Sequence, residues 1–344
     1  PVDPIRAQVA WASDSGANLA LSPDEKAIYA AGLRTSTHQS APGHETICEK
    51  CDGAGHGNTW DCTKPSHAVY KLGWDDKKAQ VFAGDPEKSG DGLDQLKVPI
   101  SVATDAEGNV YVADRGNDRV SVFGPDARPL TQFKVVQPLR LEVHRKTGAI
   151  YVLAGRDGGD VELIKFDSRT SAREVCRTMA SKKASFQPSR QPLLALDDTA
   201  DPPILYTSPF VRLEDRGDKF SEPVSLMSAA DKESPHGIGS VMELGLDRSR
   251  DWLHINSYWR YHVADGKWDC IAEPKGARKW SPMWPMHSTF SSTGSVGRDG
   301  KYYSFIGMNG GRIYRYDADM TLVPFPEAAV TQATEGDPGR PIKG

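Results

Sequence analysis

The side chains best suited to metal or thiol chemistry gather in one short segment, residues 34–66. Three of the five cysteines of the chain lie in this segment, together with several histidines. Cys48 and Cys51 form a Cys-x-x-Cys pair, which allows two sulfurs to reach one tetrahedral zinc ion. Cys62 with His56 or His44 would complete a Cys₃His set. The pattern therefore predicts a structural metal site, with zinc as the metal.

A disulfide is the alternative for the same cysteines. Cys51–Cys62 or Cys48–Cys62 would staple the segment in an oxidising compartment. The segment has few apolar residues, so burial alone cannot offset the entropy of ordering it. Covalent haem is excluded, because Asp52 and not His follows the second cysteine of the pair. We expect a covalent or metal staple here and not a catalytic thiol.

The rest of the chain shows a repeated pattern of short strands. The fold that these strands form has to hold the cysteines and histidines of residues 34–66 in place. From Pro99 to Phe133, apolar residues alternate with polar ones, and turn residues divide the stretch into four short strands. Similar units recur along the chain, and Tyr111 and Tyr151 occupy equivalent positions 40 residues apart. The units cover Asn18–Gly84, Pro99–Phe133, Gln137–Cys176, Leu193–Phe210, Val241–Cys270 and Gly294–Phe325.

A single four-stranded sheet cannot bury both faces, whereas a ring of such sheets can. The repeats therefore predict an all-β fold, a β-propeller of four-stranded antiparallel blades, with six blades favoured over seven. We expect residues 1–330 to form this single propeller, residues 34–66 to interrupt its first blade, and residues 331–344 to be a tail or linker.

The best copy of the unit resembles the NHL repeat. The matching features are Pro99, the turn Glu107-Gly108-Asn109, the strand Tyr111-Val112-Ala113-Asp114, and Asn117 with Arg119. The next copy keeps the strands, and the later copies keep only their pattern. This family includes secreted amidating lyases, gluconolactonase-like and virginiamycin-lyase-like enzymes, and many pure binding modules. The resemblance therefore predicts the fold but not the function.

The resemblance implies a ligand site at the mouth of the central channel. His236 and His287 lie in segments that would enter the innermost strands of two blades. In the amidating lyases a channel metal, a Tyr and an Arg carry the chemistry, and Tyr258 and Arg115 are the candidates here. These four residues are the predicted catalytic set of a lyase or hydrolase acting on a saccharide or peptide-like substrate.

Aromatic residues suggest a different function, binding. Five of the eight tryptophans fall between residues 252 and 284. Trp252 and Trp268 lie inside predicted strands and are expected to pack between blades. Trp280, Trp284 and Trp259 are candidates for contact with a sugar ring or an apolar protein partner.

Composition and charge argue against several classes of function. The chain has 344 residues, 42 Lys and Arg against 46 Asp and Glu, and a net charge of −4. Charges scattered in near balance argue against a nucleic-acid surface, and no apolar run is long enough for a membrane span. No phosphate-binding glycine loop or GxSxG motif occurs, so no nucleotide is expected.

The first residue is Pro1, so we expect either that a leader was removed or that the sequence is a piece of a longer protein. We predict an extracytoplasmic protein, periplasmic or secreted, that binds a protein or saccharide at a propeller face. The lyase or hydrolase activity is the alternative.

Overall fold

The computed structural model describes residues 18–39, 61–73, 76, 79–156, 159–181, 192–207, 210–226, 244–247, 251–255, 259–270, 294–296, 301–306 and 312–317. The described residues form five four-stranded antiparallel sheets, one three-stranded sheet and one two-stranded hairpin. The all-β propeller of four-stranded blades predicted from the sequence is therefore confirmed.

The strands follow one another blade by blade along the chain. Blade one contains β1 (Asn18–Leu21), β2 (Ala27–Ala31), β5 (His67–Gly73) and β6 (Gln80–Asp85). Blade two contains β7 (Pro99–Thr104), β8 (Val110–Asp114), β9 (Arg119–Phe123) and β10 (Pro129–Lys134). Blade three contains β11 (Pro138–Val143), β12 (Ile150–Gly155), β13 (Val161–Phe166) and β14 (Glu174–Ser181).

The second half of the chain repeats the arrangement. Blade four contains β15 (Leu194–Asp197), β16 (Ile204–Thr207), β17 (Val211–Glu214) and β18 (Val224–Ser225). Blade five contains β19 (Leu244–Asp247), β20 (Trp252–Ile255), β21 (Trp259–His262) and β22 (Trp268–Cys270). The three-stranded sheet contains β23 (Gly294–Val296), β24 (Tyr302–Ile306) and β25 (Arg312–Tyr316).

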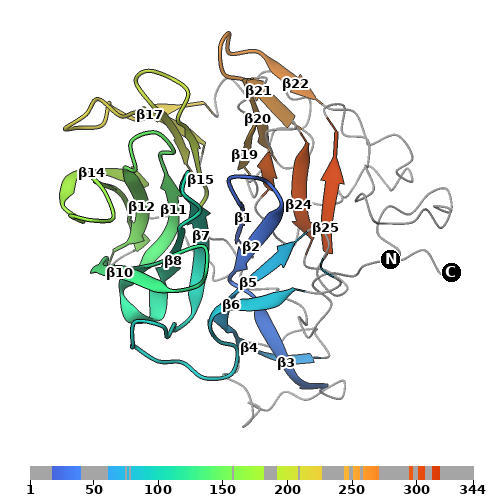
Figure 1. Cartoon of the computed structure of the whole chain (residues 1–344). Coiled ribbons are helices and arrows are strands. Elements are labelled where there is room, and N and C mark those ends of the chain that lie inside the picture. Colours follow the sequence, from blue (N-terminus) through green and yellow to red (C-terminus); the bar gives the residue numbers. More distant parts are fainter. Residues whose placement is uncertain are drawn as a thin grey trace, which may run out of the picture.

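The first strand of each sheet lies innermost, and these strands form a ring. Strands β1, β7, β11, β15, β19 and β23 each contact the next in this order, and β23 contacts β1. In Figure 1 the outer strands β10, β14 and β22 lie farther from the middle than β7, β11 and β19. Among the described residues five blades have four strands, so the prediction of six or seven such blades is wrong for this part of the chain. The remaining sector is filled by β23–β25, which has three strands among the described residues.

The hydrophobic core lies between blades and not inside one sheet. One cluster joins residues of blades two, three and four, a second joins blades four and five, and a third joins blades one and two. Strands β8 and β12 are covered by a neighbouring blade on both faces, so nearly every residue in them is buried. This explains why these strands are almost continuously apolar and do not alternate.

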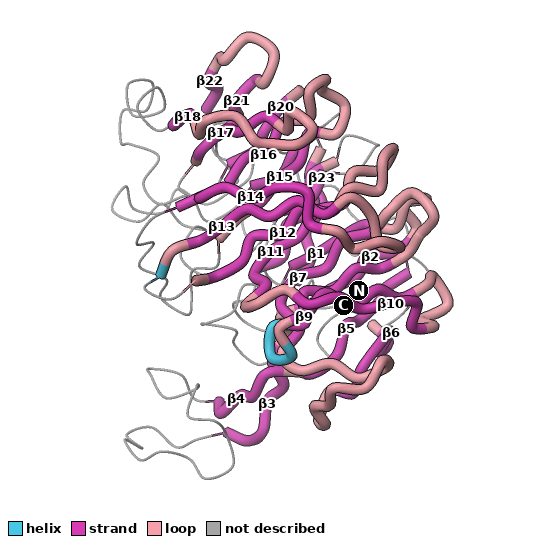
Figure 2. The backbone as a smooth tube through the Cα atoms, turned by 90° about the vertical axis from the view of Figure 1, so that its left-hand side faces the viewer, coloured by secondary structure: helices cyan, strands magenta, loops and turns pink. Residues whose placement is uncertain are grey.

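An additional hairpin interrupts blade one between its second and third strands. Strand β3 (Arg34–Gln39) pairs with β4 (Asp61–Pro65) in a separate two-stranded sheet. The hairpin projects beyond the blades in both views (Figures 1 and 2). The described residues contain no helix long and apolar enough to cross a membrane.

Candidate functional site

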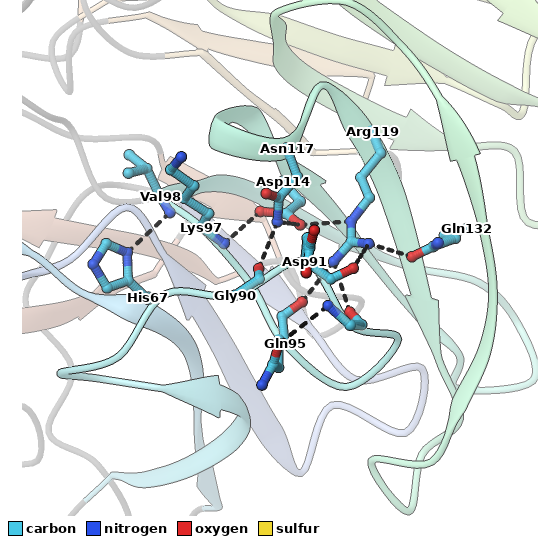
Figure 3. A network of polar contacts seen from close by, with 11 residues as sticks. His67, Gly90, Asp91, Gln95, Lys97, Val98, Asp114, Asn117, Arg119 and Gln132 are labelled. Atoms are coloured by element: carbon cyan, nitrogen blue, oxygen red, sulfur yellow. Dashed lines mark hydrogen bonds and ion pairs between the residues drawn. The ribbon is translucent and has the colours of Figure 1, made fainter.

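The loop that enters blade two is held in one conformation by a buried arginine. This loop, residues 86–98 (the entry loop), connects β6 with β7. Arg119 of β9 donates from Nη1 to the carbonyl oxygen of Asp91 at 2.7 Å. Its Nη2 donates to the carbonyls of Gly92 at 2.9 Å and Gln95 at 2.7 Å. A further bond goes to the Gln132 side chain on β10. One guanidinium therefore ties the entry loop to blade two (Figure 3).

Asp114, the last residue of β8, is the counter-ion of this arginine. Its Oδ2 lies 2.7 Å from Nε of Arg119, and its carboxyl group is fully buried. It also accepts from the backbone N–H of Lys97 and from the amide of Asn117, both at 2.7 Å. Burial raises the pKa of Asp114, and the three donors oppose this effect. Asn117 also donates to the Gly90 carbonyl at 2.8 Å, which adds another tie to the entry loop.

The short 3₁₀ turn η1 (Arg115–Asn117) packs directly against the entry loop. The backbone N–H of Gly116 donates to the Lys97 carbonyl at 2.8 Å. A Cβ at Gly116 would lie 2.5 Å from that carbonyl oxygen, so only glycine permits this approach. The entry loop and η1 are therefore one packed unit.

The entry loop and η1 together expose both apolar and charged side chains. Leu93 is 59% exposed at the middle of the entry loop. Exposed charged residues of both signs lie on the same loop and on η1. We call this set the entry-loop surface, and it comprises Lys88, Asp91, Leu93, Asp94, Lys97 and Arg115. The entry-loop surface therefore combines one exposed apolar side chain with charged side chains of both signs.

Of the predicted catalytic residues, Arg115 is described, and it lies exposed on the entry-loop surface. His236, His287 and Tyr258 lie outside the described residues, so their convergence with Arg115 stays a prediction. The lyase or hydrolase alternative, which depends on that convergence, stays a prediction as well.

The predicted binding and metal residues lie mostly outside the described residues too. This holds for Trp280, Trp284, Cys48, Cys51 and His56. Trp259 is the first residue of β21, paired with Cys270. Cys62 is in β4, directly opposite His38 of β3. Among the described residues, no group of three metal-ligating side chains is found.

Trp252 packs against the adjacent strand of its own blade, and its predicted packing between blades stays a prediction. Its ring lies 4.7 Å from the His262 ring, and the Arg260 guanidinium lies over it at 4.6 Å.

A second polar cluster, which sequence reasoning missed, joins blades three and four. Tyr151 of β12 donates its hydroxyl to Oδ2 of Asp215 at 2.6 Å. Nζ of Lys165, on the neighbouring strand directly opposite Tyr151, lies 2.7 Å from the same carboxylate. Burial, and then Asp215 itself, raise the pKa of Tyr151 far above its ordinary value. The repeat marks Tyr151 in the sequence, but no sequence signal marks its partner on the next blade.

Comparison with known families agrees with this geometry. The family model of the NHL repeat matches residues 96–123. The chain contains an NHL repeat. The NHL residues have clear roles in the structure, because Asp114, Asn117 and Arg119 build the network under the entry loop. Tyr111 donates its hydroxyl to Asp105 at 3.0 Å and is buried in the cluster that blade two shares with blades three and four.

Two solved structures are similar to the chain at low sequence identity. Kuenenia stuttgartiensis hydrazine synthase is 10% identical, with 90% of this chain and 68% of that chain covered and a TM-score of 0.39. Saccharomyces cerevisiae Sqt1 is 8% identical, with 91% and 85% covered and a TM-score of 0.42. No curated protein matches the chain.

Proposed function

We propose that the protein is a binding module, an NHL propeller whose entry-loop surface contacts a protein partner. One observation carries the proposal: the entry loop is outside regular structure, yet a buried arginine and aspartate hold it in place while Leu93 remains 59% exposed. A loop that is ordered before binding loses less entropy when a partner docks. Arg115 beside it belongs to the residue types enriched at binding hot spots.

The test compares two exposed apolar residues. Leu93→Asp places a charge at the centre of the entry-loop surface, and Val224→Asp places one on β18 of blade four, where Val224 is 50% exposed. A partner is first captured on the immobilised wild-type protein and purified. Its affinity for the three proteins is then measured by biolayer interferometry.

We expect Leu93→Asp to weaken binding at least about tenfold, since burying an uncompensated charge at an interface centre is unfavourable. Val224→Asp should leave the affinity within about twofold. Equal affinity of Leu93→Asp and wild type would place the partner elsewhere and refute the proposal.

We also propose that Cys48, Cys51 and Cys62 hold the insertion together, either around zinc with His56 or as a disulfide. The paired strands β3 and β4 support this, because Cys62 lies on the stem through which the insertion leaves and re-enters blade one. Metal analysis beside a thiol titration separates the two forms. If all three thiols titrate free and no metal is bound, the staple does not exist. The extracytoplasmic location and saccharide binding stay predictions.

A further inference from the structure

The entry loop ends at a residue with a strained backbone. Val98, the last residue of the loop, has a φ of 53°, in the left-handed region. This region is unfavourable for L-residues, and most of all for β-branched ones. The half-buried Val98 side chain packs against the hydrophobic core, and Pro99 begins β7 directly after it. Strained residues persist only where their surroundings hold them, and they gather at switch regions, so the contacts of Val98 decide whether this end of the loop stays closed.

A histidine of blade one holds this strained residue. The backbone N–H of Val98 donates to Nδ1 of His67, the first residue of β5, at 3.2 Å (Figure 3). Nδ1 can accept this bond only while it carries no proton, because both ring nitrogens of a protonated histidine are donors. The bond therefore exists with the neutral ring and is lost when the ring is protonated.

The next blade has a different acceptor at the equivalent position. Gln137, directly before Pro138 and the first strand of blade three, also has a positive φ, of 45°. Its backbone N–H donates to Oδ1 of Asp118 at 2.8 Å, and Asp118 directly precedes the third strand of blade two. Val98 and His67 occupy the same two positions one blade earlier. A carboxylate accepts hydrogen bonds throughout the neutral range, whereas histidine gains its proton between about pH 5 and 8, so only the entry loop has an acceptor that titrates there.

Charged groups of both signs lie on the elements that meet at His67. Asp85 is directly opposite His67 on β6, and its negative charge favours the protonated ring. The other charged residues on the adjoining entry loop and on β8 are Glu87, Lys88, Lys97 and Asp114. Strands β2 and β7, which also pack against β5, contain no charged residue. Burial raises the pKa of Asp114, so this carboxyl is the second group that could take up a proton here as the pH falls.

We propose that His67 is a pH switch for the entry-loop surface, which holds the loop end at Val98 when the ring is neutral and releases it when the ring is protonated. The closed form uses the Nδ1 lone pair as an acceptor, so the proton binds the released form more tightly, and a fall in pH favours release. Lys97 and Arg115 of the entry-loop surface lie next to this end, since the Gly116 N–H donates to the Lys97 carbonyl. Acid therefore weakens partner binding, and in this respect the inference rests on the function proposed above.

Hydrogen exchange of the purified full chain, with no partner present, tests the switch. Protection factors, which correct for the intrinsic pH dependence of exchange, are measured for single backbone amides by NMR between about pH 7.5 and about pH 5.5. The Val98 amide of wild type should lose protection about fivefold, the change that corresponds to one ordinary hydrogen bond. His67→Asn keeps an uncharged acceptor that does not titrate, so its Val98 amide should change by less than about twofold. The Gln137 amide, bonded to Asp118, is the internal control and should keep its protection in both proteins.

Wild-type protection of Val98 that does not change with pH would overturn the switch. An equal loss of protection in His67→Asn would also overturn it, because another group, such as Asp114, would then take up the proton. If His67→Asn does not fold, the titration of the His67 ring in wild type, followed by its NMR shifts, decides instead. Its midpoint should coincide with the loss of Val98 protection, and a different midpoint would refute the assignment.

Partner binding separates the switch from the function proposed above. The affinity of the captured partner is measured at both pH values for wild type and His67→Asn, and only wild type should bind more weakly in acid. A partner that requires Leu93 but binds wild type equally well at both pH values would overturn the regulation and leave the proposed function standing. A pH-dependent Val98 amide in a protein whose partner ignores Leu93→Asp would support the switch and refute only the proposed surface.

Discussion

Replacing Arg119 by methionine should release the entry loop and destabilise blade two. Methionine keeps much of the apolar stem but removes the bonds to the carbonyls of Asp91, Gly92 and Gln95. It also leaves the fully buried carboxylate of Asp114 without its counter-ion. Breaking a buried ion pair by removing one partner costs about 3–5 kcal/mol. Because Asp114 keeps the donors of Lys97 and Asn117, we expect a loss of about 3 kcal/mol.

Urea unfolding of wild type, Arg119→Met and the double variant Asp114→Asn/Arg119→Met measures this loss. The double variant should recover part of the stability, since its buried group at position 114 carries no charge. Hydrogen exchange should show faster exchange at the backbone amides of Gly90 and Lys97, which are bonded in the wild type. A loss below about 1 kcal/mol, as for a surface ion pair, would refute the reasoning. Unchanged exchange in the entry loop would also refute it.

Three further changes test other parts of the structure. Burial lowers the pKa of His144, and its Nδ1 accepts hydrogen bonds from two backbone N–H groups. The unfolded chain therefore binds a proton at this histidine at higher pH than the folded chain does. The free energy of unfolding should fall as the pH drops below about 6.5. Chemical unfolding between pH 7.5 and 5 should show a shallower fall for His144→Asn, and an identical fall would contradict this assignment. Gly116→Ala brings a Cβ within 2.5 Å of the Lys97 carbonyl oxygen and should cost about 1–3 kcal/mol in urea unfolding, whereas a cost near zero would mean that the turn moves freely. Tyr151→Phe removes a buried bond to the Asp215 carboxylate and should cost about 1.5–3 kcal/mol by thermal unfolding, and an unchanged melting temperature would show that the bond contributes nothing.

Much of the fold could be predicted from short-range patterns in the sequence. The four strands between Pro99 and Phe133 occur between the turn residues that predicted them, although β8 is almost continuously apolar and does not show the expected alternation. The turn before β8 is also local, because Asp105 accepts from the backbone N–H groups of Glu107 and Asn109. Such bonds join residues a few positions apart, so residue types and spacing are enough to indicate them.

The NHL motif could be recognised in the sequence, but the contacts that its residues make could not be predicted from it. Asp114, Asn117 and Arg119 lie close together in the sequence and were identified as motif residues. Their partners in the entry loop lie 17 to 28 positions earlier, and the bonds go mainly to backbone carbonyls. A backbone acceptor has no residue type to mark it, so pattern reading cannot find it.

The contacts between blades were decided by the tertiary structure alone. Tyr151 and Asp215 are 64 positions apart and belong to different blades. Period-two alternation determines which face of a strand a residue occupies, but not which residue of the next blade lies opposite it. That pairing depends on how blades tilt and stagger around the ring, as does the number of four-stranded blades. The sequence by itself therefore determined the strands, the turns and the repeat, and the packing of one blade on the next decided which polar groups meet.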